Sequence, residues 1–181
     1  MLIFNDLKVY QFMYGHVFSI DFQPTYHMSI KNRSYFKSPE SDKKKFQKWV
    51  TKLEQMNGYE YEKWSISTSF GKTQIYGLNT QNEQLTPLDI FPGFRTTAHI
   101  WDLDKGIRSL AKKFRLFLVE TNGQPNLSDG HSPDIKSLAY GEWCTEVFEK
   151  LHLESAYIAG ASFGGLVCMK IALVIPDRIK V

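Results

Sequence analysis

The sequence predicts an α/β fold, a mostly parallel sheet with helices on both faces. From residue 62 onward, short apolar segments alternate with segments of helical periodicity, the order expected where helices connect parallel strands. Some of those predicted strands, such as 114–119, are apolar throughout, as strands buried on both faces are. With 43% hydrophobic and 14% aromatic residues among 181, the chain has enough apolar material for the core of one such domain.

The first 61 residues are predicted to precede that domain as a helical extension. Residues 1–37 contain many aromatic residues without clear periodicity, and we assign them no role. Ser38-Pro39 is typical of a helix start, and Gly58 of a helix end. Between them, apolar residues recur at helical spacing: Phe46, Trp49, Val50, Leu53 and Met56. We expect this amphipathic helix to pack on its own domain, and we divide the chain into an extension (1–61) and a domain (62–181).

The domain begins with a predicted antiparallel hairpin. Residues 62–68 alternate apolar and polar side chains, a turn follows at Phe70-Gly71-Lys72, and a second strand covers 73–78. The remaining predicted elements are a strand over 85–91, a helix over 100–112, a strand over 114–119, a helix around Trp143, a strand over 156–159 and a helix over 163–174.

Residues 160–164 have the pattern of a nucleophile elbow, a sharp turn from a strand into a helix. Such a turn holds Ser162 in a strained backbone conformation where a base can reach its hydroxyl. Gly160 and Gly164 carry no side chains that would collide where strand and helix approach. The first amides of the helix have no partners within it, so the N–H of Phe163 can stabilise negative charge on a substrate oxygen.

The Gly-x-Ser-x-Gly string by itself is a weak signal. It arises by chance in roughly one chain in twenty of this length. A glycine-rich turn that only packs a strand on a helix fits the string equally well. A dinucleotide-binding fingerprint is excluded, because position 162 would have to be glycine. Gly71-Lys72-Thr73 does not end a phosphate-binding P-loop, because the first glycine of that motif would fall at Ile66.

Composition argues against several partners. The net charge of +3 is small and the lysines are scattered apart from those at 43–45, which favours a solvated helix face over nucleic-acid binding. The amino end does not have the pattern of a signal peptide, and no apolar run approaches twenty residues, so no membrane span is expected. Cys144 and Cys168 lack metal-ligand spacing and are expected to be buried reduced thiols in a cytoplasmic protein. The oligomeric state is not predicted.

From about residue 62 to 181 the chain resembles the α/β-hydrolase superfamily, and within it the esterase-like serine hydrolases. Residues 160–164 match that family's elbow, and Phe91-Pro92-Gly93-Phe94 lies where the family has its His-Gly oxyanion loop, with Pro92 in place of histidine. The resemblance implies that Ser162 is the nucleophile and that the backbone amides of Phe163 and Phe94 form the oxyanion hole. It implies no metal and no organic cofactor.

Two further segments carry the resemblance. Residues 119–128 resemble the family's Asp-x-x-Gly…Ser segment after the fourth strand, with Glu120 in place of the aspartate. Residues 176–181 resemble the lead-in to a sixth strand.

The family order of catalytic residues is serine, acid and histidine, with the last two after the sixth and eighth strands. All the histidines of this chain precede Ser162, and each is expected to be a surface or packing residue: His16, His27, His99, His131 and His152. We therefore expect the front part of a serine hydrolase of small acyl substrates, truncated before its sixth strand, with strand 156–159 as an open edge, and inactive by itself. The alternative is a finished, non-catalytic binding module.

Overall fold

The computed structural model describes residues 2–5, 8–13, 16–21 and 35–180. The first three ranges are strands β1 (Leu2–Asn5), β2 (Lys8–Met13) and β3 (His16–Asp21), which pair antiparallel in the order β1-β2-β3. This small sheet falls in the segment to which the sequence assigned no role.

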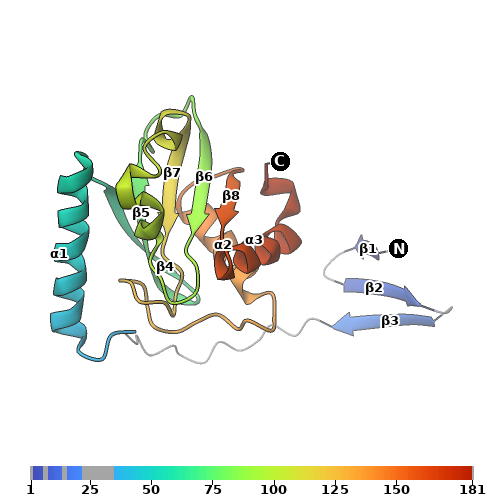
Figure 1. Ribbon diagram of the computed structural model, residues 1–181. Helices are drawn as coiled ribbons and strands as arrows, with labels where there is room; N and C mark the ends of the chain where they lie inside the picture. The colour runs from blue at the N-terminus through green and yellow to red at the C-terminus, as the bar shows by residue number, and fades with distance from the viewer. Residues whose placement is uncertain (1, 6–7, 14–15, 22–34, 181) are drawn as a thin grey trace.

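The main sheet has five strands in the order β4-β5-β7-β6-β8 (Figure 1). They are β4 (Glu62–Thr68), β5 (Gly71–Leu78), β6 (Thr86–Phe91), β7 (Phe114–Val119) and β8 (Tyr157–Gly160). Strand β5 runs antiparallel to both of its neighbours, whereas β7, β6 and β8 pair in parallel. The mostly parallel sheet predicted from the sequence is therefore confirmed. Because the carboxyl ends of parallel strands meet at one edge, the loops after β6, β7 and β8 lie together there.

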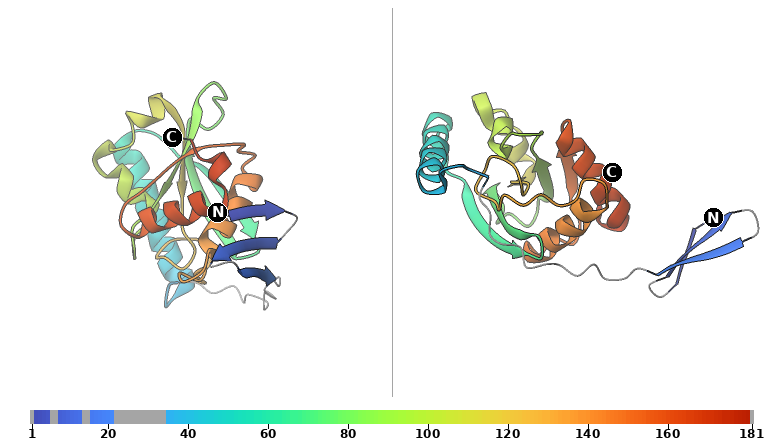
Figure 2. Two further views of the ribbon diagram at one scale, coloured as in Figure 1. Left: turned by 90° about the vertical axis from the view of Figure 1, so that its right-hand side faces the viewer. Right: turned by 90° about the horizontal axis from the view of Figure 1, so that it is seen from below.

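Alternate side chains of the strands enter two hydrophobic cores on opposite faces of the sheet. Phe117 and Val119 of β7 pack under helices α2 (Ala139–Lys150) and α3 (Phe163–Val174). Their neighbours Leu116 and Leu118 face the other core, which lies under helix α1 (Pro39–Asn57) and the segment after β6. The views in Figure 2 show this three-layer arrangement. Burying each such side chain stabilises the fold by about 1.5–3 kcal/mol.

Helix α1 packs on the domain with only part of its predicted apolar stripe. Val50 and Leu53 are buried, whereas Trp49 is 38% exposed and Met56 is 64% exposed. The helix ends as predicted at Gly58, which has a φ of 78° and donates its N–H to the carbonyl of Glu54 at 2.8 Å. The boundary placed at residue 61 stays a prediction.

The prediction of a helix over 100–112 is wrong. Two 3₁₀ segments occupy this region, η1 (Ala98–Lys105) and η2 (Leu110–Lys112). Asp104 and Lys105 have φ angles of 56° and 63°, a left-handed conformation that interrupts a helix.

The path of η1 is set by contacts to a distant part of the chain. The buried carboxylate of Asp102 accepts hydrogen bonds from the Asn57 amide at 2.8 Å, from the Tyr59 hydroxyl at 2.6 Å and from the Tyr61 hydroxyl. Tertiary contacts of a buried charge therefore override the local helical pattern.

Among the described residues, β8 forms one edge of the main sheet, and pairing continues just before it. Ala156 donates to the Arg178 carbonyl and accepts from the Lys180 amide, both at 3.0 Å, so that Ala156 and Ile179 form a parallel bridge. The segment η3 (Pro176–Arg178) brings these residues back to the sheet. This is the placement expected of a lead-in to a further strand.

Candidate active site

Ser162 lies at the turn between β8 and α3. Its backbone has a φ of 55° and a ψ of −117°, and its side chain is exposed. A non-glycine residue in this conformation carries about 1–3 kcal/mol of strain, which the surrounding structure must offset. The carbonyl of Ser162 accepts the Leu166 amide at 3.2 Å, so the serine caps the first turn of the helix. The predicted placement of Ser162, at a strand end with positive φ, is confirmed.

The glycines on either side of Ser162 allow two backbones to touch. A Cβ atom added to Gly160 would overlap the backbone of Gly164. A Cβ atom added to Gly164 would lie 2.6 Å from the Phe91 carbonyl oxygen and 2.8 Å from that of Pro92. Both distances are shorter than van der Waals contact, so neither position accepts a side chain without displacement of the backbone. These contacts bring the elbow against the end of β6.

The loop after β6, residues 92–97, reaches the elbow. An added Cβ atom on Gly93 would lie 3.7 Å from the Ala161 carbonyl oxygen. The rings of Phe94 and Phe163 meet edge to face with their centroids 5.8 Å apart, and Phe94 is 63% exposed. Within the described part of the chain, the amides of Phe94 and Phe163 have no hydrogen-bond acceptor. The structure thus brings together Ser162 and the two residues named as oxyanion donors.

Two buried side chains of the loop after β7 hold the loop after β6 in place. The carboxylate of Glu120 accepts the Ala98 amide at 3.0 Å and also the Thr97 hydroxyl. The side-chain Oε1 of Gln124 accepts a hydrogen bond from the backbone amide of Arg95 at 2.6 Å, and Arg95 has a φ of 57°. Sequence reasoning missed Gln124. No local pattern marks a side chain that binds a backbone amide 29 positions earlier.

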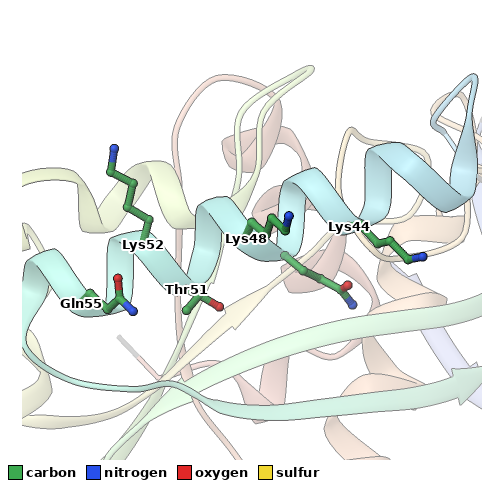
Figure 3. Close-up of a pocket in the computed structure, with 6 residues that line it drawn as sticks. Lys44, Lys48, Thr51, Lys52 and Gln55 are labelled. Carbon is green, nitrogen blue, oxygen red and sulfur yellow. The ribbon is translucent and has the colours of Figure 1, made fainter.

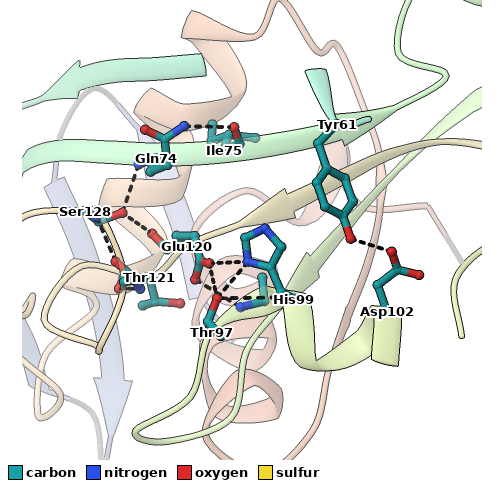
Figure 4. A network of polar contacts seen from close by, with 11 residues as sticks. Tyr61, Gln74, Ile75, Thr97, His99, Asp102, Glu120, Thr121 and Ser128 are labelled. Atoms are coloured by element: carbon teal, nitrogen blue, oxygen red, sulfur yellow. Dashed lines mark hydrogen bonds and ion pairs between the residues drawn. The ribbon is translucent and has the colours of Figure 1, made fainter. Parts of the chain in front are cut away.

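Glu120 is itself fixed to the sheet, as Figure 4 shows. Its amide donates to the Gln74 carbonyl of β5 at 3.0 Å. The Ser128 hydroxyl donates to the Glu120 carbonyl and accepts the Gln74 amide, both at 2.8 Å. The segment 119–128, singled out by the family resemblance, therefore connects β5, β7 and the loop after β6.

Ser162 has no base among the residues whose side chains the structure describes. Its hydroxyl makes no hydrogen bond to them. His99 is completely buried and its Nδ1 lies 3.2 Å from the Glu120 carboxylate, so it is a packing histidine as expected. His131 and His152 are exposed, which also fits the expectation. His27 and the side chain of His16 lie outside the described residues.

The described part of the chain contains no cluster of three or more histidine, cysteine or acidic residues that could hold a metal. Of the two cysteines, Cys144 is buried and Cys168 is half-buried, and both are free thiols. Burial raises the pKa of Cys168 to about 12 and that of Cys144 well above its usual value. Both are therefore protonated near neutral pH. None of the described helices is long and apolar enough to cross a bilayer.

A shallow groove runs along the outer side of α1 (Figure 3). Every residue that lines it belongs to this one helix and is polar or charged: Lys44, Gln47, Lys48, Thr51, Lys52 and Gln55. Of the lysines at 43–45, Lys44 and Lys45 are exposed, as predicted for a solvated helix face, whereas Lys43 is half-buried. The groove has no residue in common with the site at the ends of β6, β7 and β8.

The known proteins with similar sequences include two carboxylesterases. No protein-family model matches the chain. The uncharacterized carboxylesterase nap of Bacillus subtilis is 30% identical over 115 residues, 64% of this chain and 37% of that protein. The carboxylesterase YbfK of the same organism is 29% identical over 121 residues, 67% of this chain and 40% of that protein.

A solved structure agrees with these sequence relatives. The crystal structure of carboxylesterase CesB (YbfK) from Bacillus subtilis has a TM-score of 0.66 and 27% identity, covering 77% of this chain and 48% of that chain. The chain thus spans less than half the length of the proteins that it matches.

Proposed function

The chain belongs to the α/β-hydrolase superfamily, and from this premise we propose that its protein is a serine hydrolase of carboxylic esters that acts through an acyl-Ser162 intermediate. The observation that carries the proposal is the backbone of Ser162, exposed at a strained turn with a φ of 55° at the start of a helix. The carboxylesterases among the relatives support an ester as the substrate class. We propose a small acyl compound as substrate.

In the proposed reaction, the Ser162 oxygen attacks the acyl carbon while a histidine base takes the hydroxyl proton. Negative charge develops on the carbonyl oxygen, and the amides of Phe163 and Phe94 donate to it. The bond to the leaving alkoxide breaks, and the protonated base returns its proton to that oxygen. Water, deprotonated by the same base, then attacks the acyl carbon of the acyl-serine, the bond to the Ser162 oxygen breaks, and the protonated base returns its proton to that oxygen as the carboxylic acid leaves. No described histidine is bonded to Ser162, so we propose that the base and its acidic partner come from elsewhere in the protein.

A fluorophosphonate probe tests the proposal on the protein expressed from its whole reading frame. We expect the probe to label Ser162 in the native protein, as located by peptide mass, and not after heat denaturation. The Ser162→Ala variant should lose both the label and the hydrolysis of a p-nitrophenyl ester. Ser137→Ala, which changes another exposed serine, should retain both. Native protein without label at Ser162, or ester hydrolysis that survives Ser162→Ala, would overturn the proposal.

One observation favours the alternative of a non-catalytic binding module. His99, which follows the loop after β6, is completely buried and bonded to Glu120 and Thr97, so it is not available to Ser162. Removing triad members from serine hydrolases lowers the rate by several powers of ten. Retained binding of an ester analogue by a protein without hydrolysis or labelling would favour this alternative.

We also propose a reducing compartment, the cytoplasm, for the protein. The free thiols of Cys144 and Cys168 carry the proposal, because oxidising compartments favour disulfides. Alkylation of freshly purified, unfolded protein without a reductant should modify both Cys144 and Cys168, as located by peptide mass, and a disulfide at either position would contradict this proposal.

A further inference from the structure

The loop that carries the proposed oxyanion donor Phe94 is connected to helix α1 through one buried histidine. His99 has no exposed surface, and its Nδ1 lies 2.9 Å from the Thr97 hydroxyl and 3.2 Å from the Glu120 carboxylate. Glu120 in turn binds the Ala98 amide at 3.0 Å. These four residues form one closed group of hydrogen bonds at the end of the loop (Figure 4).

The His99 ring is enclosed by aromatic rings from three other segments. The Tyr76 ring of β5 meets it edge to face at 4.2 Å between centroids, and the Tyr61 ring does so at 5.2 Å. Helix α1 closes the outer side with Trp49 at 5.7 Å and Phe46 at 5.9 Å. The position of the imidazole is therefore fixed by helix α1 and by the sheet together.

A buried carboxylate needs hydrogen-bond donors, because burial without them is costly. Glu120 is completely buried, and His99 stands beside the oxygen that also binds Thr97. The same carboxylate binds the Ala98 amide, so the orientation of its side chain sets the path of the chain after Phe94. A donor amide of an oxyanion hole must be placed to within a fraction of an ångström.

We propose that His99, held by Phe46 and Trp49 of helix α1, is a positioning residue for the oxyanion loop. It orients the Glu120 carboxylate, which holds the Ala98 amide and thereby the Phe94 amide beside Ser162. The inference rests on the proposed hydrolase function. It gives helix α1, which lies before the main sheet in the chain, a part in transition-state stabilisation.

Two substitutions of His99 separate its hydrogen bond from its ring. His99→Phe keeps an aromatic ring for the four neighbours but loses the Nδ1 contact to Glu120. His99→Asn places an amide near the position of Nδ1 and loses the ring. Because oxyanion donors act chiefly in the transition state, we expect His99→Phe to lower kcat about tenfold with little change in KM. The Asn variant should recover most of the lost kcat.

Helix α1 provides a matched pair of variants. Trp49→Ala removes a ring that contacts His99 and should lower kcat in the same way. Met56→Ala, on the same helix but 64% exposed and without a ring near His99, should leave kcat unchanged. Urea denaturation of each variant identifies a general loss of stability, which would lower kcat without any specific effect on the loop.

Amide hydrogen exchange reports on the order of the loop after β6 and does not depend on catalytic activity. In His99→Phe, exchange should accelerate at the amides of Arg95 and Ala98, which are bonded to Gln124 and Glu120. The bonded amides of Gly164 and Leu166 at the other side of the site should keep their protection. If His99→Phe changes neither kcat nor the exchange of the loop amides, this inference is overturned. The proposed function is tested separately by Ser162→Ala, and it stands if that variant loses activity. Activity that persists in Ser162→Ala would instead remove the proposed function, and loop exchange alone would decide the role of His99.

Discussion

Asp89 lies in the middle of β6 with no exposed surface and without a hydrogen-bond partner for either carboxylate oxygen among the described residues. It faces the core under α2 and α3, because Phe91, two positions further along the same strand, packs in that core. Burial raises the pKa of Asp89 itself from 3.8 to about 8. The folded protein therefore holds this carboxyl protonated at neutral pH.

The sign of the effect on stability follows from proton binding. Between about pH 4 and pH 8 the folded state binds a proton that the unfolded state has released, so the free energy of unfolding falls as the pH rises. Each pH unit corresponds to about 1.4 kcal/mol. From about pH 5 to about pH 7.5 the loss is about 3 kcal/mol. Asp89→Asn cannot release a proton, so it should remove this part of the pH dependence.

Urea denaturation of the wild type and of Asp89→Asn at both pH values measures the difference. The Asn variant should gain about 3 kcal/mol relative to the wild type on going from the lower to the higher pH. Asp177→Asn, which changes an exposed aspartate, is the matched control and should follow the wild type. An equal pH dependence in the wild type and in Asp89→Asn would refute the assignment of a buried, protonated Asp89.

Two further predictions concern packing at the elbow and the anchor of η1. Gly164→Ala should lower the free energy of unfolding by about 2 kcal/mol, because its methyl group would meet two backbone oxygens. The control Gly165→Ala should leave that free energy unchanged or raise it slightly. Thermal unfolding compares the two variants, and equal effects would contradict the close backbone contact at Gly164. Tyr61→Phe should lower the free energy of unfolding, measured by urea denaturation, by about 1–3 kcal/mol, because the buried Asp102 carboxylate loses a hydrogen-bond donor. The Tyr76 hydroxyl makes no such bond among the described residues, so an equal loss in Tyr76→Phe would contradict this explanation.

The sequence could predict what depends on neighbouring residues. The elbow needs two glycines within two positions of Ser162, and a strand before it and a helix after it are visible in the apolar pattern. Helix α1 has its own start and stop residues, Pro39 and Gly58. The alternation of strands and helices indicated the sheet and its covering layers. Each of these features is determined by local chain geometry and by side-chain periodicity.

The sequence could not predict what depends on residues far apart. The conformation of η1 follows from Asp102, whose partners lie more than 40 positions earlier. The support of the loop after β6 comes from Glu120 and Gln124 in another loop. Periodicity carries no information on such polar contacts, because a buried carboxylate or amide leaves no repeating pattern.

The strand order also bears on when the candidate site can form during synthesis. Strands β4 and β5 are joined by a short turn, whereas the parallel pair of β6 and β8 joins Asp89 to Ile158, with β7 and α2 between them in the chain. Contacts between such distant segments close later than local ones because more chain entropy is lost. On a ribosome the loop after β6 and its anchors Glu120 and Gln124 emerge before Ser162. We therefore expect the turn that carries Ser162 to dock onto a loop after β6 that is already folded.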